Sequence, residues 1–361
     1  MSPTVYLHIG APKTGTTYLQ DRLSRNAASL ARHGVHFPTG SHLVSPPTFH
    51  FRAALDLLEQ DWGGPPGHAE GAWDALVQRV HRRSGTVIVS HEILAPAAPE
   101  RVARAMADLG PDVHIVYTAR DLGRQVPAAW QESVKQGRTW SYAHFARRSA
   151  RGRTWPARAF DLPTVLSTWG AHVPPEHVHL ITVPDRQDSA GDDLWHRFCH
   201  VVGIDPAWTP EQSHRANASL GVVEVDLLRH LNKRLGRMVR QHQAHDAVVR
   251  ALLVEDVFSH SRSPRITLRP DDFEWVDATA DRWVEWAREA GIDVVGDLDE
   301  LRPARPAAGT WRDPDRVPAR KRARVAVDAL AAMTEEVARR PDPGSTLRNR
   351  VRRRAGRLRS L

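Results

Sequence analysis

The sequence predicts an α/β fold in three layers: a central parallel sheet flanked by helices, followed by a helical C-terminal extension. Apolar runs at 5–9, 86–89 and 113–118 each end in polar residues, and helical sequence follows each of them. Uninterrupted apolar runs of this length are typical of parallel strands that are buried on both faces. The first run also leads into a loop of glycine and threonine, which a helix follows. This strand, loop and helix predict an anion site at the sheet's edge.

The loop after the first predicted strand reads G-A-P-K-T-G-T-T from Gly10 to Thr17. Glycine lets the backbone approach an anion, the helix N-terminus offers unpaired N–H groups, and lysine adds a positive charge. A Walker A loop places its lysine after the second glycine, whereas Lys13 precedes Gly15. An ordinary ATP-binding loop is therefore disfavoured. A turn without a ligand is the remaining alternative.

This spacing, close to the N-terminus, resembles the 5′-phosphosulfate loop of sulfotransferases that use 3′-phosphoadenosine 5′-phosphosulfate (PAPS), and the pattern looks closest to bacterial members. The resemblance implies a P-loop-like fold, PAPS as sulfuryl donor and no metal. It assigns Lys13 to stabilise the oxygen between sulfur and nucleotide. It also assigns donor binding to the rest of the loop, namely Gly10, Pro12, Lys13, Thr14, Gly15, Thr16 and Thr17.

Two candidate bases follow the second predicted strand. A carboxylate or an imidazole at a strand's end can take a proton from an attacking hydroxyl group. Carbohydrate sulfotransferases that resemble this chain carry a glutamate in the corresponding segment, and cytosolic relatives carry a histidine. We expect Glu92 to be the base and keep His91 as the competing candidate. Alternation along a strand predicts that only one of them enters the site.

The third predicted strand ends at Arg120. In sulfotransferases a segment of this type carries an arginine that binds the donor's 3′-phosphate, with a serine eight residues later. Arg120 fits the arginine, but Ala128 occupies the position of the serine. Arg124, Gln125 and Ser133 are the candidates to replace it.

A later polar loop, 213–221, precedes a helix predicted from about 220 to 240. By resemblance this loop folds over the donor, which makes Ser219 a candidate donor ligand. The alternative is that Asn217 or Ser219 caps the helix. The R-K-G-x-x-G motif of cytosolic sulfotransferases is missing.

Further helices are predicted at 17–32, 69–83, 139–173, 192–202, 271–289 and 323–340, and a fourth strand at 178–184. An extended piece is predicted at 34–38. The expected domains are a sulfotransferase-like domain at 1–301, a proline-rich linker at 302–322 and a basic extension at 323–361, helical or disordered.

Composition excludes several classes of protein. One cysteine among 361 residues, Cys199, excludes an internal disulfide, and its apolar neighbours predict a buried side chain. His196 and His200 have a metal-compatible spacing, but no third ligand accompanies them, so we expect no metal there. No apolar run is long enough to span a membrane, and no signal peptide precedes the first strand. The expected location is the cytoplasm.

The net charge of +8 comes almost wholly from one end of the chain. Seven arginines lie between Arg348 and Arg359, and without them the net charge is +1. This tail is most simply a solvated end, with contact to an anionic surface as the alternative. No aromatic residues are interleaved with the arginines, so we do not expect nucleic acid as a partner.

The predicted function is transfer of a sulfuryl group from PAPS to a hydroxyl group of a glycan, glycolipid or secondary metabolite. Tryptophans at 62, 73, 130, 140 and 155 and arginines at 147–158 are expected around the acceptor. The alternatives are a P-loop nucleotide kinase or hydrolase, and a non-catalytic polyanion-binding protein that uses the arginine tail. The oligomeric state is not predicted.

Overall fold

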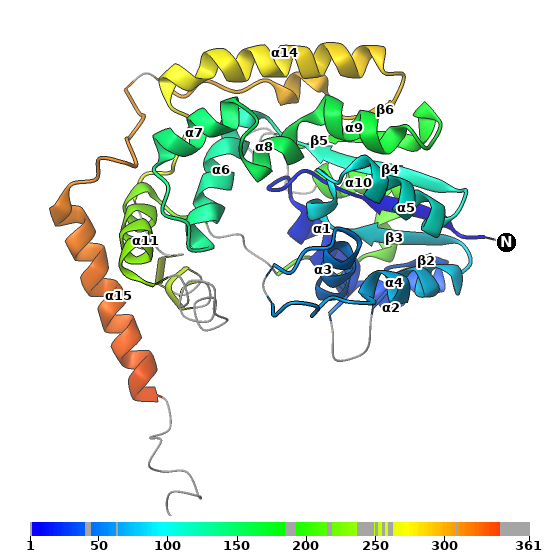
Figure 1. Ribbon diagram of the computed structural model, residues 1–361, viewed down its shortest axis with the longest axis horizontal. Coiled ribbons are helices and arrows are strands. Elements are labelled where there is room, and N and C mark those ends of the chain that lie inside the picture. Colours follow the sequence, from blue (N-terminus) through cyan, green and yellow to red (C-terminus); the bar gives the residue numbers. More distant parts are fainter. Residues whose placement is uncertain are drawn as a thin grey trace, which may run out of the picture. The chain divides into compact units, whose positions relative to one another are not determined.

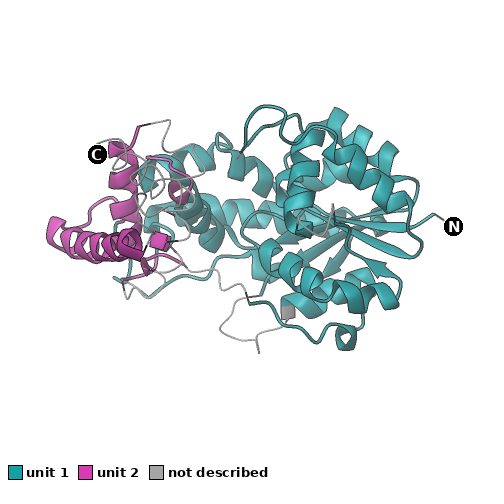
Figure 2. Cartoon of the chain, turned by 90° about the horizontal axis from the view of Figure 1, so that it is seen from below, with its two compact units in different colours: residues 1–133, 140–217, 266–313 teal, residues 134–139, 218–265, 314–361 magenta. Residues whose placement is uncertain are grey.

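The computed structural model describes residues 2–39, 45–62, 64–184, 193–214, 219–236, 249, 252–254, 257–258, 263–307 and 309–339. The chain forms two compact units (Figure 2), which comprise residues 1–133, 140–217 and 266–313 in unit 1, and 134–139, 218–265 and 314–361 in unit 2. The sheet lies in unit 1. The extension predicted from residue 323 shares unit 2 with 218–265, and most of the predicted linker joins unit 1.

A six-stranded sheet forms the centre of unit 1 (Figure 1), and all its strand pairs are parallel. The strand order is β2-β3-β1-β4-β5-β6. The strands are β1 (Thr4–His8), β2 (Val35–His36), β3 (Thr86–Ser90), β4 (Val113–Ala119), β5 (Val178–Thr182) and β6 (Asp293–Val295). The predicted α/β class with a central parallel sheet is confirmed.

The helices follow the strands in the order expected for an α/β fold. Those of unit 1 are α1 (Thr16–Arg25), α2 (Ala27–Arg32), α3 (Pro46–Leu57), α4 (Ala72–His81), α5 (Pro99–Leu109), α7 (Tyr142–Ala150), α8 (Trp155–Phe160), α9 (Leu162–Gly170), α10 (Asp193–Val202) and α14 (Phe273–Glu289). Helix α6 (Leu122–Lys135) begins in unit 1, and α11 (Val222–Arg234) and α15 (Ala319–Arg339) lie in unit 2. Short 3-10 turns are η1 (Glu92–Leu94), η2 (Pro175–His177), η3 (Pro206–Trp208), η6 (Pro270–Asp272) and η7 (Leu298–Leu301).

Helices cover both faces of the sheet. On one face, α1 and α10 bury their apolar residues against strand residues, in a cluster that includes Leu19, Leu23, Phe198, Ile88, Val116 and Ile181. On the other face, α9 packs against β4, and α5 and α14 pack against α9. Cys199 lies in the first cluster and is buried, as predicted. Burial of this much apolar surface on both sides holds the loops at the strand ends in fixed positions.

Two predicted helices are interrupted for identifiable reasons. The helix expected at 17–32 is two helices, because Asn26 closes α1 with a bond from its Nδ2 to the Arg22 carbonyl. The amide of Asn26 also bonds both backbone groups of Glu211, which fixes the break. The helical stretch expected at 139–173 is three helices, because Thr154 caps the start of α8 and Asp161 lies between α8 and α9. The predictions had the right element type but missed these caps.

Unit 2 adds one contact and corrects one expectation. Helix α15 packs along α11, and Arg322 donates a hydrogen bond to Asp226 at 2.6 Å. The cap of α11 is Gly221 rather than Asn217 or Ser219. Asn217 and the tail Arg348–Arg359 lie outside the described residues. Among the helices that the structure describes, none is both long enough and apolar enough to cross a lipid bilayer.

Candidate functional site

Three polar segments meet at the carboxyl edge of the sheet. β1 lies between β3 and β4, so the loop after β1 has the ends of β3 and β4 on either side. Backbone bonds fix this arrangement: the His91 N–H donates to the His8 carbonyl at 3.0 Å, and the Ala11 N–H donates to the Thr118 carbonyl at 2.8 Å. β2 and β3 follow β1 in the chain and lie on one side of it, whereas β4 lies on its other side, so the strand order reverses at β1. In open α/β sheets ligands bind at such a reversal.

The loop between β1 and α1 has a left-handed backbone at three positions. The φ angles are +37° at Gly10, +69° at Lys13 and +99° at Gly15. A Cβ atom at Gly10 would lie 2.9 Å from Thr16 Oγ1, so this position requires glycine for space as well as for conformation. Lys13 is one of two described non-glycine residues with positive φ. Such strain persists only where the surroundings enforce it, and it concentrates at functional sites.

Buried threonines form the floor of this loop. Thr14 Oγ1 donates to the Ala11 carbonyl at 2.5 Å and lies 2.5 Å from Thr118 Oγ1 on β4. Gln125 on α6 donates from Nε2 to the Pro12 carbonyl at 2.8 Å. These bonds attach the loop to β4 and to α6. The Thr14 hydroxyl and the Pro12 carbonyl are therefore engaged in holding the shape of the loop.

A second buried network lies beneath the loop and joins β1 to β3. His8 Nδ1 lies 2.8 Å from Ser90 Oγ, and Gln20 on α1 donates to the Ser90 carbonyl at 2.7 Å. Burial, and secondarily the charge on His91, lowers the pKa of His8 to about 3. The His8 imidazole is therefore neutral at physiological pH. It acts as a structural hydrogen-bonding group and adds no charge under the loop.

The start of α1 contains a buried hydroxyl without a partner. Among the described residues no group bonds Thr16 Oγ1, although Thr16 is only 3% exposed. The first N–H groups of a helix also have no intrahelical partner, and they belong here to the turn that contains Thr16 and Thr17. An orphaned hydroxyl next to free amide groups fits an oxyanion, which accepts hydrogen bonds from both.

Lys13 forms an ion pair that the sequence did not predict. Its Nζ lies 2.8 Å from Glu132 Oε2 on α6. From the other side, Arg120 donates to the Lys13 carbonyl at 3.4 Å. The structure therefore brings Lys13 and Arg120 together as expected, and it adds Glu132 as a counter-charge. No local pattern relates residues 13 and 132, so only the fold could reveal this pair.

The two candidate bases differ in their environment. His91 caps η1, where its Nδ1 accepts a hydrogen bond from the Ile93 N–H at 3.3 Å, and its ring lies against Phe51. Burial lowers the pKa of His91, although the nearby Glu92 carboxylate opposes this effect. The Glu92 carboxylate is half-buried and accepts no hydrogen bond from any described residue. β3 ends at Ser90, so strand alternation does not decide between them.

The candidates for the missing serine at Ala128 are all engaged in other contacts. Arg124 pairs with Asp121 and donates to the carbonyls of Val183 and Pro184. Gln125 supports the loop from below.

Ser133 donates to the Trp130 carbonyl at 2.7 Å, within its own helix. The role of Ser133 as a donor ligand stays a prediction. Ser219 is exposed and belongs to unit 2, and its role also stays a prediction. His196 and His200 are both exposed on α10. Trp73 and Trp130 are completely buried, so the expectation that they line the acceptor site is wrong: both are core residues.

A polar cavity adjoins η1 within unit 1. It measures about 180 Å³, and the residues that line it include Gln60, Ile93, Arg101, Trp155 and Arg158. Ile93 follows the candidate base Glu92 directly in the chain, although Glu92 itself does not line the cavity. Among the described residues, Gln60 Oε1 has no hydrogen-bond partner although the atom is buried. A ligand hydroxyl group in this cavity would satisfy that oxygen.

Comparisons with known proteins give little beyond the fold. No protein-family model and no curated protein matches the chain. Among solved structures, the chain is similar to a sulfotransferase from Alicyclobacillus acidocaldarius, with 16% identity over 68% of this chain and 98% of that chain and a TM-score of 0.39. It is also similar to the sulfotransferase domain of the olefin synthase from Synechococcus PCC 7002, with 14% identity over 77% of this chain and 94% of that chain and a TM-score of 0.32. Because both TM-scores are low, the chemistry of the site rests on the residues of this chain.

Proposed function

We propose that this protein is a PAPS-dependent sulfotransferase that acts on a hydroxyl acceptor. The observation that carries the proposal is the loop after β1, in which a strained lysine and a buried, unpartnered Thr16 hydroxyl meet at the start of a helix. The lysine precedes the second glycine, a spacing that Walker A loops do not use.

The residues of the loop fit the donor. Gly10 and Gly15 permit the left-handed backbone of the loop, and the first-turn N–H groups with the Thr16 hydroxyl offer donors to a 5′-phosphate. Arg120, attached to the Lys13 carbonyl, would bind the 3′-phosphate. When bound, PAPS supplies a sulfuryl group whose bond to the bridging oxygen breaks as the acceptor oxygen attacks sulfur.

The residues of the chain then have two tasks. Lys13 would bring a positive charge to the oxygen between sulfur and nucleotide, on which negative charge develops. To do so, its ammonium group must leave the Glu132 carboxylate and bind that oxygen instead. Glu92 takes the proton of the acceptor hydroxyl group as the new O–S bond forms. We favour Glu92 over His91, because the His91 Nδ1 lone pair is already used to cap η1.

The cavity beside η1 supports a polar acceptor. Gln60 Oε1 would accept a hydrogen bond from one hydroxyl group, Arg101 and Arg158 would contact further oxygen atoms, and Trp155 offers a ring face. A sugar or a polyhydroxylated metabolite has this combination of donors and apolar faces. The cavity is smaller than the usual range for a whole ligand, so it would hold one ring of a larger acceptor.

Sulfate transfer from labelled PAPS to an extract of candidate acceptors tests the proposal. Lys13→Ala should lower the rate by about 100-fold or more, the size of effect seen when one charge-stabilising donor is lost. Transfer at the parental rate in Lys13→Ala would refute the assignment. Labelled products that are only small phenol sulfates would refute the polar acceptor.

Ligand-induced thermal stabilisation separates the other function classes. Adenosine 3′,5′-bisphosphate should stabilise the full chain, and a chain shortened to residue 339, more than ATP with magnesium does. A preference for ATP would favour a kinase or hydrolase. Stabilisation by heparin alone, lost on shortening, would favour a polyanion-binding protein that uses the Arg348–Arg359 tail.

Two variants separate the candidate bases. Glu92→Gln should reduce the turnover rate by about 100-fold to 10,000-fold, the usual contribution of a general base. His91→Ala should reduce it less, through the loss of the η1 cap. The reverse order of effects would assign the base to His91.

A further inference from the structure

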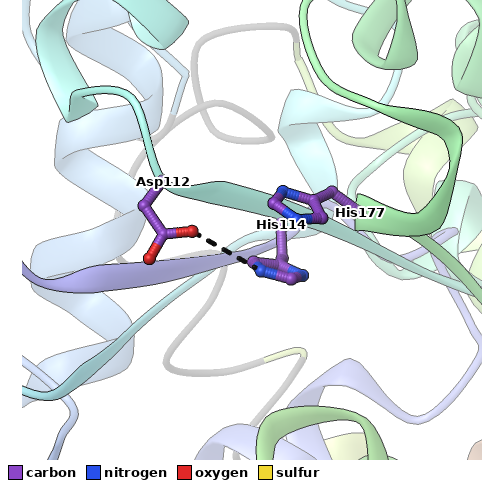
Figure 3. A group of neighbouring side chains, drawn as sticks. All are labelled: Asp112, His114 and His177. Atoms are coloured by element: carbon purple, nitrogen blue, oxygen red, sulfur yellow. Dashed lines mark ion pairs between the residues drawn. The ribbon is translucent and has the colours of Figure 1, made fainter.

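A second polar cluster lies at the opposite edge of the sheet, at the amino ends of the strands. Asp112 directly precedes β4, His114 is its second residue, and His177 ends η2 directly before β5. One ligand atom from each of the three residues lies within 4.8 Å of those of the other two. Figure 3 shows the Asp112 carboxylate directed at the His114 ring, and the His177 ring next to it. Since the strands are parallel, this edge is remote from the loop at their carboxyl ends.

The strand register places histidines on one face of the sheet. His114 pairs with Tyr6, and His179 pairs with Val116, two residues beyond His114. Side chains two apart on a strand share a face. His114 and His179 therefore lie on the face that α1 and α10 cover further along, where Val116 belongs to the apolar core. At the amino ends this face becomes polar.

A chain of hydrogen bonds fixes the proton positions in these rings. His179 Nδ1 lies 2.7 Å from Asp293 Oδ2, and only a protonated Nδ1 can bond a carboxylate. When the His179 ring is neutral, its Nε2 carries a lone pair and accepts a hydrogen bond. The donor is His114 Nδ1, which lies 2.9 Å away. The lone pair of neutral His114 is therefore at Nε2. Carboxylate and histidine partners select the tautomer of a metal-ligating imidazole in this way.

The lone pair of His114 Nε2 faces another acceptor. Asp112 Oδ1 lies 3.7 Å from it, while Asp112 Oδ2 accepts a hydrogen bond from Thr4 at 2.6 Å. In this tautomer His114 Nε2 and Asp112 Oδ1 are both acceptors, and neither atom carries a proton that could bond the other. His177 Nδ1 is buried and has no hydrogen-bond partner among the described residues. Asp112 and His114 thus face each other with electron pairs, and the His177 Nδ1 beside them lacks a partner among the described residues, an arrangement that a cation would satisfy once the His177 ring presents a lone pair.

We propose that Asp112, His114 and His177 bind one divalent metal ion of the zinc type. Two imidazoles and a carboxylate are ligands that Zn²⁺ accepts, and three protein ligands leave a fourth position for water. The His179–Asp293 pair supports His114 from behind. The site differs from the exposed His196 and His200 pair on α10, and it does not depend on the proposed sulfuryl transfer.

Binding requires a rotation of one ring. The rings of His114 and His177 are stacked with centroids 3.8 Å apart and an angle of 16° between their planes. A metal ion lies in the plane of each ring that binds it, so stacked rings cannot share one. All three residues are partly exposed, but His177 ends a short turn, whereas His114 is held between Tyr6 and His179. His177 is therefore the residue that turns.

Equilibrium dialysis of the full chain against Zn²⁺ tests this site. The protein is prepared without a polyhistidine tag, stripped with a chelator, and analysed for zinc by atomic emission. We expect one equivalent of zinc to bind and the thermal unfolding midpoint to rise. His177→Ala and Asp112→Asn should each weaken binding at least about tenfold, and Asp293→Asn about 10-fold to 100-fold through His179. Co²⁺ should give a d–d absorption band that His177→Ala removes.

The matched control is His196→Gln with His200→Gln, which removes two exposed histidines elsewhere and should leave zinc affinity unchanged. Circular dichroism of each variant shows whether it folds, and positions 112 and 177, which are both partly exposed, give independent variants. No stoichiometric zinc binding by the parent protein would overturn the proposal. Binding that survives in both His177→Ala and Asp112→Asn, or that disappears in the α10 control, would also overturn it.

Discussion

Glu132 should act against donor binding, because it occupies the lysine that a bound anion needs. Lys13 Nζ lies 2.8 Å from Glu132 Oε2, so an anion on the other side of the ammonium group lies about 6 Å from this carboxylate. At that distance two unit charges repel by about 0.7 kcal/mol at the dielectric constant of water and by about 2.8 kcal/mol at an effective value of 20. The two side chains are 34% and 19% exposed. The expected repulsion is therefore about 1–2 kcal/mol.

Glu132→Gln removes this charge and keeps the shape of the side chain. Isothermal titration should show adenosine 3′,5′-bisphosphate binding about 5-fold to 30-fold more tightly than to the parent protein. The gain should shrink as the salt concentration rises, because salt screens partly exposed charges. Glu285→Gln on α14 makes the same change in net charge at an exposed position and serves as the control. Unchanged or weaker binding in Glu132→Gln would refute the electrostatic reasoning.

Three further predictions concern the supports of the loop and sheet. Burial lowers the pKa of His50 to about 3 in the folded state, against about 6.5 in the unfolded chain, so this residue's contribution to stability falls as pH drops below 6.5. His8 has the same shift, so urea unfolding at about pH 5 should show a loss of stability that is about 2 kcal/mol smaller in His50→Gln than in the parent protein, and an equal loss in both would contradict the shift. Gly10→Ala should cost about 1–3 kcal/mol in bisphosphate binding or stability, whereas Gly152→Ala, with φ +65° and open surroundings, should leave bisphosphate binding unchanged in the same titration. Thr14→Val should lower the free energy of unfolding, measured with urea, by about 1–3 kcal/mol. The double variant Thr14→Val with Thr118→Val should lose less stability than the two single variants lose together, and strict additivity would contradict the hydrogen bond between the two hydroxyl groups.

The sequence predicted what local patterns determine. Apolar runs identified β1, β3, β4 and β5 but missed the short edge strand β6. The spacing of Gly10, Lys13 and Gly15 identified the loop, because glycine conformation and helix N-termini are local properties. The parallel arrangement of the strands also predicted that the segment beginning with Arg120 lies beside the loop. These predictions needed only neighbouring residues and one rule about sheets.

Contacts between distant residues could not be predicted in this way. Glu132 lies on α6, and its pairing with Lys13 depends on how that helix passes the loop. The histidine cluster depends on the register of β4 and β5, which no single segment specifies. The unpartnered Gln60 oxygen appears only once η1 and α8 are placed beside it. The position of Asn26 as a helix break likewise depends on Glu211, far along the chain.

The hydrogen-bonded floor of the loop has a consequence for kinetics. Thr14, Thr118 and Gln125 already hold the loop in its left-handed shape without a ligand. An arriving anion therefore does not need to order this loop, and the main step left within it is to open the partly exposed Lys13–Glu132 pair. Association should then occur in a single phase, at a rate governed by diffusion and ionic strength rather than by a slow rearrangement.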